Sequence, residues 1–332
     1  MNKSLLDIVN DCDRFPYYDD NPTHYEAHMQ GFHTFRVQGC DALLGYMPNE
    51  TAKQFSSFTN SDDFAKGYWY IDSAARTITL ATAIDAAPGD RSRVVAYTLA
   101  KMKKERVFDV LRGWRDELYP VYGRDGKLLL EIERSACPLF GVVGYGILMT
   151  GYVKHGNDLR IWVPKRSKNK QTFPGMYDVT VGGGLATKEN PFECAIREAE
   201  EEASLPRKVI EAKATPVGNL SYIYVRDEKA GGGTGLIQPE VEYIYDIELD
   251  EDTIPRPNDS EVQVFHLLTV KEVQEALRKG KFKTNCGVVM VDFLIRHGIL
   301  TKENAPGYLD VLSTRMHRQL EFPTVSHDIP IP

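Results

Sequence analysis

The stretch Gly183–Leu205, GGLATKENPFECAIREAEEEASL, decides the fold. Asn190 followed by Pro191 is typical of a helix start, with Asn as the N-cap, Pro in the first turn and Glu193 at the third position. The sequence therefore predicts a helix that starts at Asn190 and ends at Ser204. Its apolar side is expected to consist of Phe192, Ile196, Ala199 and Ala203.

Three carboxylates of this helix share one face. With 3.6 residues per turn, Glu198, Glu201 and Glu202 fall within an arc of about 100°. Like charges on neighbouring turns repel, and Arg197 can pair with one neighbour but not with all three. Carboxylate oxygens gathered in this way are typical ligands of Mg²⁺ or Mn²⁺. A solvated Glu-rich helix is the other interpretation of the letters REAEEEA taken alone.

The composition of the whole chain is that of an ordinary globular protein, with 42% hydrophobic and 26% charged residues. Its 332 residues indicate two domains. The 40 Lys+Arg and 47 Asp+Glu residues give a net charge of −7. An acidic chain is a poor binder of long nucleic acid, so no nucleic-acid partner is expected.

Cysteine usage and hydropathy indicate a reducing, aqueous compartment. The five cysteines are odd in number, widely spaced and without a CxxC pair, so neither a disulfide framework nor a structural zinc site is expected. The first residues lack the composition of a targeting peptide, and no apolar run approaches the ~18–20 residues of a membrane span. We expect a cytoplasmic protein without a membrane partner.

Further elements can be predicted on either side of the decisive stretch. Ser4, with Asp7 three residues later, predicts a helix to Asp13, and Thr269 with Glu272 predicts a capped helix to Gly280. Residues 141–152 and 159–164 read as a hairpin. Other strands are expected at 177–181, 217–225, 240–249 and 262–268, and an apolar helix at 285–296. The Pro-rich C-terminal tail is expected to be loosely held.

The spacing in the decisive stretch resembles the Nudix box, G-x5-E-x7-R-E-U-x-E-E-x-G-U. Gly183, Glu189 and the run from Arg197 to Leu205 match every fixed position except Ser204, where the family has Gly. The aliphatic position is the small Ala199. The resemblance implies an α/β fold, an α/β/α sandwich around a mixed sheet. It also implies metal-dependent hydrolysis of a diphosphate linked to an organic group.

The resemblance also implies roles for individual residues. Metal ligands would be Glu198, Glu201 and Glu202, together with the backbone carbonyl of Gly182, and the cofactor would be Mg²⁺ or Mn²⁺. Glu198 or Glu201 would also be catalytic as the general base. Gly183, Glu189 and Arg197 would be structural, with a Glu189–Arg197 salt bridge that ties the loop to the helix. Because Gly eases a left-handed turn, Ser204 puts the turn after the helix in doubt.

A second resemblance covers residues 165–184, KRSKNKQTFPGMYDVTVGGG. This segment is similar to R-S-x-x-K-x-T-x-P-G-x-x-D-x-x-x-x-G-G in Nudix proteins related to isopentenyl-diphosphate isomerase and in fungal and plant Nudix proteins described as thiamine-pyrophosphokinase-related. Arg166, Lys168 and Lys170 would bind the substrate diphosphate; a solvated basic loop is the alternative. Isomerase activity is not expected, because the catalytic Cys motif and upstream His residues of that family are not found.

Two later segments resemble the thiamine-related group. They are Pro239-Glu240-Val241 and Pro257-Asn258-Asp259-Ser260-Glu261-Val262. Glu240 would be a further metal ligand and Glu261 a catalytic base, although both can equally be ordinary acids near strand ends. The run from Gly231 to Gly235 lacks the Lys-Ser/Thr of a phosphate-binding P-loop, so a flexible hairpin loop is expected there.

The N-terminal part resembles the accessory domain of the same group, around FDVLRGWRDELYPVY at Phe108–Tyr122. Trp114, Tyr119 and Tyr122 are candidates for stacking on a flat heterocycle at the domain interface, with burial in the core as the alternative. The role of this domain does not follow from these residues.

We therefore predict an α+β accessory domain at 1–135, a Nudix domain at 136–320 and a tail at 321–332. The expected reaction is cleavage of a thiamine-diphosphate-type compound, including oxidised or damaged derivatives, to the monophosphate and phosphate. One alternative is hydrolysis of a nucleoside diphosphate derivative such as ADP-ribose, a dinucleotide or a cap. The other is a non-catalytic module that binds a diphosphate. The partner in each case is a small molecule, and the oligomeric state does not follow from the sequence.

Overall fold

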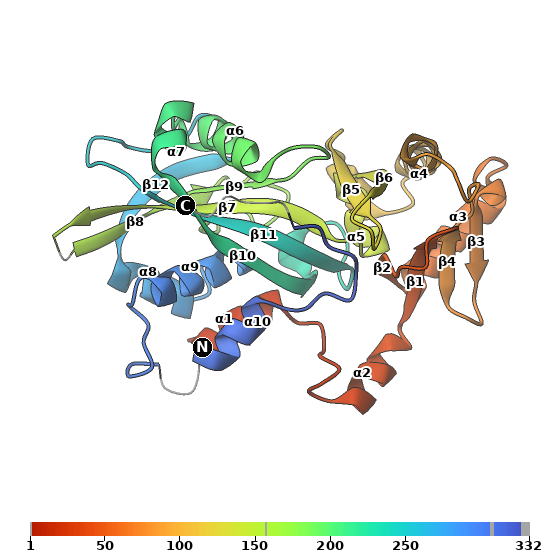
Figure 1. The fold of residues 1–332 in the computed structure, drawn as a ribbon, viewed down its shortest axis with the longest axis horizontal. Helices are drawn as coiled ribbons and strands as arrows, with labels where there is room; N and C mark the ends of the chain where they lie inside the picture. Colours follow the sequence, from red (N-terminus) through yellow and green to blue (C-terminus); the bar gives the residue numbers. More distant parts are fainter. Residues whose placement is uncertain (1, 157, 306–308, 327–332) are drawn as a thin grey trace.

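The computed structural model describes residues 2–156, 158–305 and 309–326. Two lobes lie side by side, a larger one around a six-stranded sheet and a smaller one around a four-stranded sheet (Figure 1). The larger lobe contains α1 (Leu5–Cys12), β7 (Gly144–His155), β8 (Asp158–Arg166), β9 (Val181–Gly184), α6 (Pro191–Ala203), α7 (Arg207–Lys213), β10 (Ala214–Val225), η4 (Glu228–Ala230), β11 (Ile237–Glu248), β12 (Val262–Thr269), α8 (Val270–Arg278), α9 (Thr284–Arg296) and α10 (Leu309–Met316).

The smaller lobe is the accessory domain. Its elements are α2 (Pro22–Met29), β1 (Phe32–Val37), β2 (Gly45–Pro48), α3 (Asn49–Ser61), η1 (Ala65–Gly67), β3 (Trp69–Asp72), β4 (Thr77–Leu80), α4 (Pro88–Lys104), η2 (Asp109–Gly113), β5 (Leu118–Tyr122), β6 (Leu128–Glu133), η3 (Arg134–Ala136) and α5 (Cys137–Phe140). The four-stranded sheet has the order β2-β1-β4-β3, and β5 and β6 form a separate hairpin. The predicted α+β character of this domain agrees with that arrangement.

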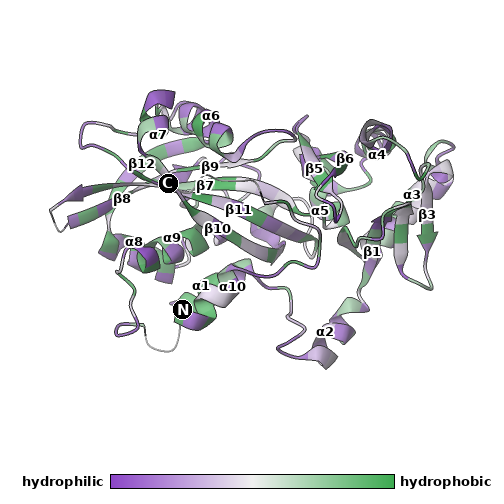
Figure 2. Ribbon diagram, in the orientation of Figure 1, coloured by the Kyte–Doolittle hydropathy of each residue, from purple (hydrophilic) through white to green (hydrophobic). Residues whose placement is uncertain are grey.

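The large sheet is mixed, as predicted. Its order is β10-β11-β7-β8-β12, β9 pairs with β7, and only the pair β7–β11 is parallel. Helices α6 and α7 cover one face, and α8 and α9 cover the other (Figure 1). The expected α/β/α sandwich is therefore confirmed. Helices α7 and α8 each carry hydrophilic stretches beside hydrophobic ones, as surface helices do (Figure 2).

Alternation along the strands fills two cores, one on each side of this sheet. On β7, Ile147 and Met149 belong to the core beneath α6, whereas Leu148 between them belongs to the core beneath α9. Side chains of a strand point to opposite faces in turn, so a strand covered on both faces is apolar throughout. The position of β7 in the middle of the sheet follows from this pattern.

Three helix starts agree with the sequence. Ser4 and Asp7 form a capping box on α1, Thr269 and Glu272 form one on α8, and Asn190 caps α6 through a 2.8 Å bond from the N–H of Phe192. At the other end of α6, Ser204 adopts the left-handed conformation that Gly favours, with φ of 54°. The helix therefore ends as the motif requires, with serine in the strained position.

The strand expected at 177–181 is misplaced. The structure places strand β9 at Val181–Gly184, where it pairs with Gly146–Met149 of β7. A Cβ at Gly183 would lie 2.0 Å from a carboxylate oxygen of Glu198. Glycine is therefore required here because the carboxylate of α6 lies directly on the strand. Sequence reasoning ended the strand at the glycines because glycine is rare inside strands.

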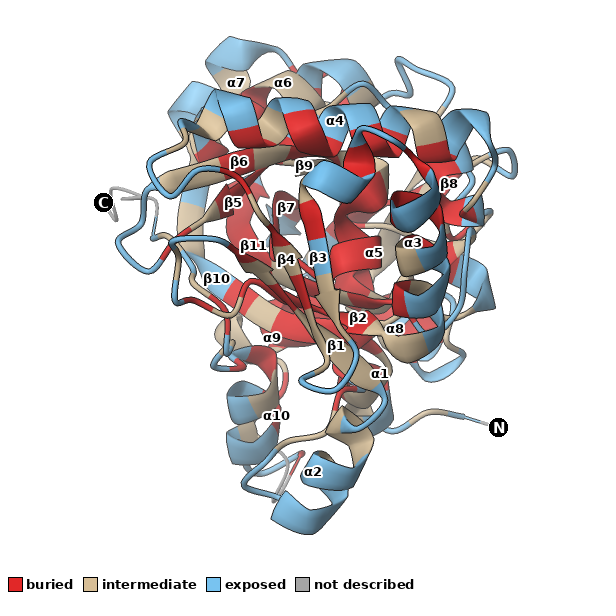
Figure 3. Ribbon diagram, turned by 90° about the vertical axis from the view of Figure 1, so that its right-hand side faces the viewer, coloured by how far each residue is buried: buried red, intermediate tan, exposed pale blue. Residues whose placement is uncertain are grey.

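Two helices pack on the other side of the predicted domain boundary. Helix α1 lies outside the accessory domain, because Ile8, Val9 and Cys12 are buried in the core beneath α9. Conversely, α5 is buried throughout in the accessory domain core, where Phe140 contacts Phe35 (Figure 3). The chain thus starts on the larger lobe, crosses to the accessory domain and returns after α5.

The described part of the tail, 321–326, is held rather than loose. Glu321 accepts hydrogen bonds from the hydroxyls of Tyr25 and Tyr46. The backbone of Val325 bonds to the hydroxyls of Tyr145 and Tyr243, each at 3.2 Å. The tail therefore ties the accessory side to the large sheet. Residues 327–332 of the predicted tail lie outside the described ranges.

Candidate active site

The loop before α6 is tied to the helix by Glu189 and Arg197. Arg197 donates to the two oxygens of Glu189 at 2.8 and 3.2 Å, and Glu189 in turn accepts the N–H of Ala186 at 3.2 Å. The structure thus contains the ion pair expected between these two residues. Arg197 also contacts Glu198 at 2.8 Å and Glu201 at 3.1 Å. One guanidinium therefore positions the loop and the start of the acidic face.

Two carboxylates of α6 lie against the glycines of β9. Glu202 accepts the N–H of Gly182 at 3.2 Å, and Glu198 lies over Gly183. Burial raises the pKa of Glu198 to about 6, although the Arg197 charge opposes this rise. Burial also raises the pKa of Glu202 well above its usual value, and the charges of Glu198 and Asp178 add to the effect. Two buried acids side by side call for a cation.

Glu201 lies differently from its two neighbours. Its side chain is 56% exposed and contacts Arg197 at 3.1 Å. The helical arc predicted that all three carboxylates point the same way, but the structure separates Glu201 at the surface from Glu198 and Glu202 against the sheet. The assignment of Glu201 as a metal ligand stays a prediction that this geometry supports less well.

A further acidic group comes from the loop before β12. Carboxylate oxygens of Glu202, Asp259 and Glu261 lie within 4.8 Å of one another, a set that fits the oxygen ligands of Mg²⁺ or Mn²⁺. Glu261 was predicted for this site from its resemblance to the family, whereas Asp259 was missed. Asp259 accepts the N–H of Glu261 at 2.8 Å, so the two are fixed together. An Asp–x–Glu pair before a strand was the only available signal.

Glu240 does not join that group in the described structure. It lies on β11 beside Glu242, and both accept hydrogen bonds from the hydroxyl of Tyr222, at 2.5 and 3.0 Å. Burial and the neighbouring Glu240 raise the pKa of Glu242 to about 7. The assignment of Glu240 as a metal ligand stays a prediction that this geometry supports less well, because its oxygens are bonded to Tyr222 and to Gln238 at 2.6 Å.

The basic loop is more structural than predicted. Arg166 is buried and donates to Asp178 at 2.5 Å and to the carbonyls of Thr172 and Phe173. Its role as a phosphate ligand stays a prediction that this geometry supports less well, because the guanidinium bonds to its own loop. Lys170 pairs with Glu261 at the acidic group. Lys168 is exposed, and no ion pair joins it to any residue of the described ranges.

The three aromatic residues predicted to stack on the substrate differ in where their side chains lie. Trp114 lies under Lys103 and bonds to Asp116 at 2.7 Å, and Tyr122 packs edge-on against Tyr145; neither of the two lines the cleft between the lobes. Their stacking role stays a prediction that these positions support less well. Tyr119 does line the cleft. Two tyrosines that the sequence analysis missed, Tyr222 and Tyr224 of β10, line it as well.

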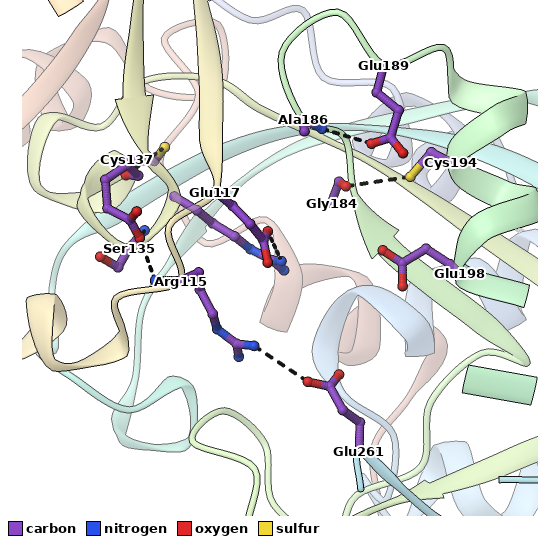
Figure 4. A network of polar contacts seen from close by, with 12 residues as sticks. Arg115, Glu117, Ser135, Cys137, Gly184, Ala186, Glu189, Cys194, Glu198 and Glu261 are labelled. Carbon is purple, nitrogen blue, oxygen red and sulfur yellow. Dashed lines mark hydrogen bonds and ion pairs between the residues drawn. The ribbon is translucent and has the colours of Figure 1, made fainter. Parts of the chain in front are cut away.

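This cleft has a volume of about 580 Å³. Its walls include η2 and η3 of the accessory domain, the glycines of β9, and the acids Glu240 and Glu242. The run Gly231–Gly233 also lines it and packs closely on the accessory domain, since a Cβ at Gly232 would lie 3.0 Å from Val110. Figure 4 shows Arg115 reaching from the accessory side to Glu261, with Glu198 on the side of α6; neither carboxylate is among the residues that line the cleft.

All five cysteines are free thiols in the structure, and four of them are buried. Cys286 donates to Asp178 at 2.7 Å beneath the basic loop, and burial holds its pKa well above the usual value.

None of the helices built from described residues is long and apolar enough to cross a bilayer.

Comparisons with known proteins also divide the chain into two parts, although the first match includes helix α1, which packs on the larger lobe. A domain of unknown function, DUF4743, matches residues 5–144, and the NUDIX domain matches residues 149–286. The uncharacterized protein YJR142W of Saccharomyces cerevisiae is 42% identical over 242 residues, which are 71% of this chain and 70% of that protein. Nudix hydrolase 20, chloroplastic, of Arabidopsis thaliana is 33% identical over 280 residues, 84% of this chain and 71% of that one. Nudix hydrolase 24, chloroplastic, is 33% identical over 82% and 69%.

Proposed function

The chain belongs to the Nudix hydrolase family, and from this premise we propose that it cleaves the diphosphate of a thiamine-diphosphate-type compound to the monophosphate and phosphate. It is a hydrolase that acts on phosphorus anhydrides. Nudix hydrolases generally use divalent metal ions, typically Mg²⁺ or Mn²⁺. The substrate and the roles of individual residues are part of the proposal.

The metal site of the proposal consists of Glu198, Glu202 and Glu261, with the carbonyl of Gly182. The donor set fits the ion, because these are hard oxygen atoms and because Glu202 is buried without a cation strong enough to hold its pKa low. When bound, Mg²⁺ or Mn²⁺ neutralises the diphosphate and polarises the bond to phosphorus. Asp259 offers a further carboxylate oxygen within 4.8 Å of those of Glu202 and Glu261, and it accepts the N–H of Glu261.

The chain's own groups would then orient the substrate and handle a proton. A water would attack one phosphorus, the P–O bond to the bridging oxygen would break and that oxygen would leave on the other phosphate, and the proton of the water would go to Glu198 or Glu261. Arg197 keeps Glu198 in place, and Lys170 does the same for Glu261. Gly182, whose carbonyl belongs to the proposed metal site, lines the cleft, so a substrate held there would extend into the space between the two lobes.

One observation carries the choice of substrate class: the organic end of the cleft is aromatic and acidic. Tyr222 and Tyr224 are among its lining residues, with 2% and 4% of their surfaces exposed, and the hydroxyl of Tyr222 bonds to Glu240 and Glu242. A cationic or amino-bearing heterocycle suits such a lining, because its positive charge or N–H groups can pair with the carboxylates. A thiamine-type compound combines that kind of ring with a diphosphate.

The direct test is phosphate release by the purified full chain with Mg²⁺ or Mn²⁺. The panel contains thiamine diphosphate, its oxidised analogues, ADP-ribose and a dinucleotide polyphosphate. Metal-dependent release confined to the thiamine-type compounds supports the proposal. Release from nucleotides alone supports the alternative of a nucleoside diphosphate hydrolase.

A binding module without turnover is the remaining alternative. It is less well supported, because the chain keeps every carboxylate of the motif and the Glu189–Arg197 ion pair. Absence of release from the whole panel would favour it. For the compartment we keep the cytosol as the proposal, although the two plant relatives are named chloroplastic.

A further inference from the structure

The accessory domain faces the acidic motif with positive charge. Three arginines of this domain, Arg112, Arg115 and Arg134, line the cleft, and the single accessory acid among the lining residues is Asp109. Arg112 is 72% exposed and pairs with Asp109 at 3.0 Å, so it belongs to the rim. Arg115 and Arg134 lie deeper. We propose that Arg115 and Arg134 bind the phosphates of the substrate and thereby complete the active site from the second domain.

Arg134 lies directly on strand β9, against Gly184. A Cβ at Gly184 would lie 3.3 Å from its guanidinium carbon, and the ring of Tyr119 lies beneath the guanidinium at 5.5 Å. The charge of Glu198 acts on it, because Tyr119, Glu117 and Glu198 raise the pKa of Arg134 against the opposing effect of burial. A phosphate held by a metal at Glu198 would therefore lie within reach of this guanidinium.

Arg134 is also held in place and still has donors to offer. The side chain of Arg134 donates one hydrogen bond, from Nη1 to Glu117 at 2.8 Å. No other hydrogen bond joins the Arg134 side chain to the described residues. A guanidinium has five N–H donors in one plane, which matches the oxygens of a phosphate. Fixed geometry with free donors is what a phosphate ligand needs, because little entropy is then lost on binding.

Arg115 approaches from the other side of the metal-ligand group. Its backbone N–H is fixed on Glu133 at 2.9 Å, and its side chain reaches Glu261 at 3.5 Å (Figure 4). That contact is long for a charged hydrogen bond, so the guanidinium can turn to a phosphate at small cost. Arg115 and Arg134 thus flank the space in front of Glu198 and Glu261.

The residues predicted to bind phosphate from the sequence do not neutralise the charge of the diphosphate. Arg166 is committed to Asp178 and its own loop, Lys170 is committed to Glu261, and Lys168 is exposed and does not line the cleft. A diphosphate carries more negative charge than one divalent ion neutralises, so the site needs further cations. The accessory arginines supply them, which gives the domain of unknown function a part in substrate binding.

The inference rests on the proposed function. The test distinguishes a failure of the arginine site from a failure of the proposed reaction. Arg115→Ala, Arg134→Ala and Arg134→Lys are compared with Arg93→Ala, a 79% exposed arginine on α4 of the same domain. One readout is the affinity for inorganic pyrophosphate with Mg²⁺, by calorimetry, and the other is KM and kcat for whichever substrate the wild type hydrolyses. Each alanine variant should weaken pyrophosphate binding and raise KM roughly 10- to 100-fold, as the loss of a charged hydrogen bond implies.

Arg134→Lys should recover part of the affinity, because the charge stays while the planar fork is lost. Arg93→Ala should behave as the wild type. Unchanged pyrophosphate affinity and KM in correctly folded Arg115→Ala and Arg134→Ala would overturn the inference, even if the protein is an active hydrolase. Weakened pyrophosphate binding in the variants of a protein that hydrolyses nothing would support the arginine site and refute the proposed reaction.

Discussion

Arg197 of α6 holds Glu189 of the preceding loop through two hydrogen bonds of 2.8 and 3.2 Å, and the same guanidinium contacts Glu198 at 2.8 Å. The residue therefore links the shape of the loop to the position of a proposed metal ligand. Arg197 and Glu189 pair at two points because a planar guanidinium matches the two oxygens of a carboxylate.

This relationship predicts the effect of Arg197→Lys. A lysine keeps the charge but cannot bond Glu189 and Glu198 together, so the loop and the carboxylate lose their fixed relation. We expect activity to fall roughly 10- to 100-fold, as for other residues that orient metal ligands. Steady-state kinetics measure the change. Arg207→Lys is the control, because Arg207 pairs with Glu193 away from the site, and equal losses in both variants would contradict the assignment.

Metal binding should stabilise the wild type and not Glu202→Gln. Glu202 is buried between Gly182 and the acidic pair Asp259 and Glu261, so the amide removes a central ligand. At a Mg²⁺ concentration about 100 times the dissociation constant, binding to the native state adds roughly 2.7 kcal/mol to the free energy of unfolding. Thermal denaturation with Mg²⁺ and with EDTA measures it. An equal Mg²⁺-dependent shift in Glu202→Gln would remove Glu202 from the site.

The buried pair Arg166–Asp178 should matter for stability more than for chemistry. Replacing Arg166 by Met removes the ion-pair partner of Asp178 and leaves only the weaker support of Lys283 and Cys286, which costs up to roughly 3–5 kcal/mol. Burial acts to raise the pKa of Asp178, but Arg166 and Lys283 prevail and lower it from 3.8 to about 2. Chemical denaturation of the wild type and Arg166→Met at neutral pH measures the loss. A variant as stable as the wild type would contradict the role assigned to Arg166.

The same pair sets a direction for the pH dependence. Because the pKa of Asp178 is lower in the folded chain than in the unfolded one, its contribution is fully present above about pH 4 and is lost as the pH falls through about 2. The stability difference between the wild type and Arg166→Met should therefore shrink over that acid range. A difference that stays constant down to about pH 2 would show that the ionisation of Asp178 is not its cause.

The C-terminal segment should stabilise the contact between the lobes. The hydroxyl of Tyr46 donates to Glu321, and burial, followed by this carboxylate, raises the pKa of Tyr46. Tyr46→Phe leaves the carboxylate without one donor, so we expect a loss of roughly 1.5–3 kcal/mol. Tyr70→Phe, at a 63% exposed tyrosine of the same domain, is the control. Equal stability of Tyr46→Phe and the wild type would show that the tail is not held by this bond.

Much of the larger domain follows from the sequence because its signals are local. Caps at Ser4, Asn190 and Thr269 are read from residues three or fewer positions apart, and β7 is recognisable as an apolar run. The resemblance to the Nudix box then supplied the Glu189–Arg197 pair and the α/β/α arrangement. Such features depend on neighbours in the chain, so a single sequence contains them.

What the sequence did not reveal depends on contacts between distant segments. Arg166 was expected to bind phosphate because charge was visible, whereas its burial beside Asp178 was not. Glu201 follows the same helical arc as Glu198, yet the sheet covers only one of the two. Arg115 and Arg134 lie in the other domain, and nothing near them in the chain indicates the motif that they face.

The central claim is metal-dependent hydrolysis of a diphosphate by the carboxylates of α6. The most direct measurement is phosphate release from the diphosphate panel by the wild type, Glu198→Gln and Glu193→Gln, with Mg²⁺ and after its removal by EDTA. We predict release that requires Mg²⁺, is reduced at least ~10²-fold in Glu198→Gln, and is unchanged in Glu193→Gln, whose side chain is exposed beside Arg207. Undiminished release by Glu198→Gln, or release that persists in EDTA, would contradict the account.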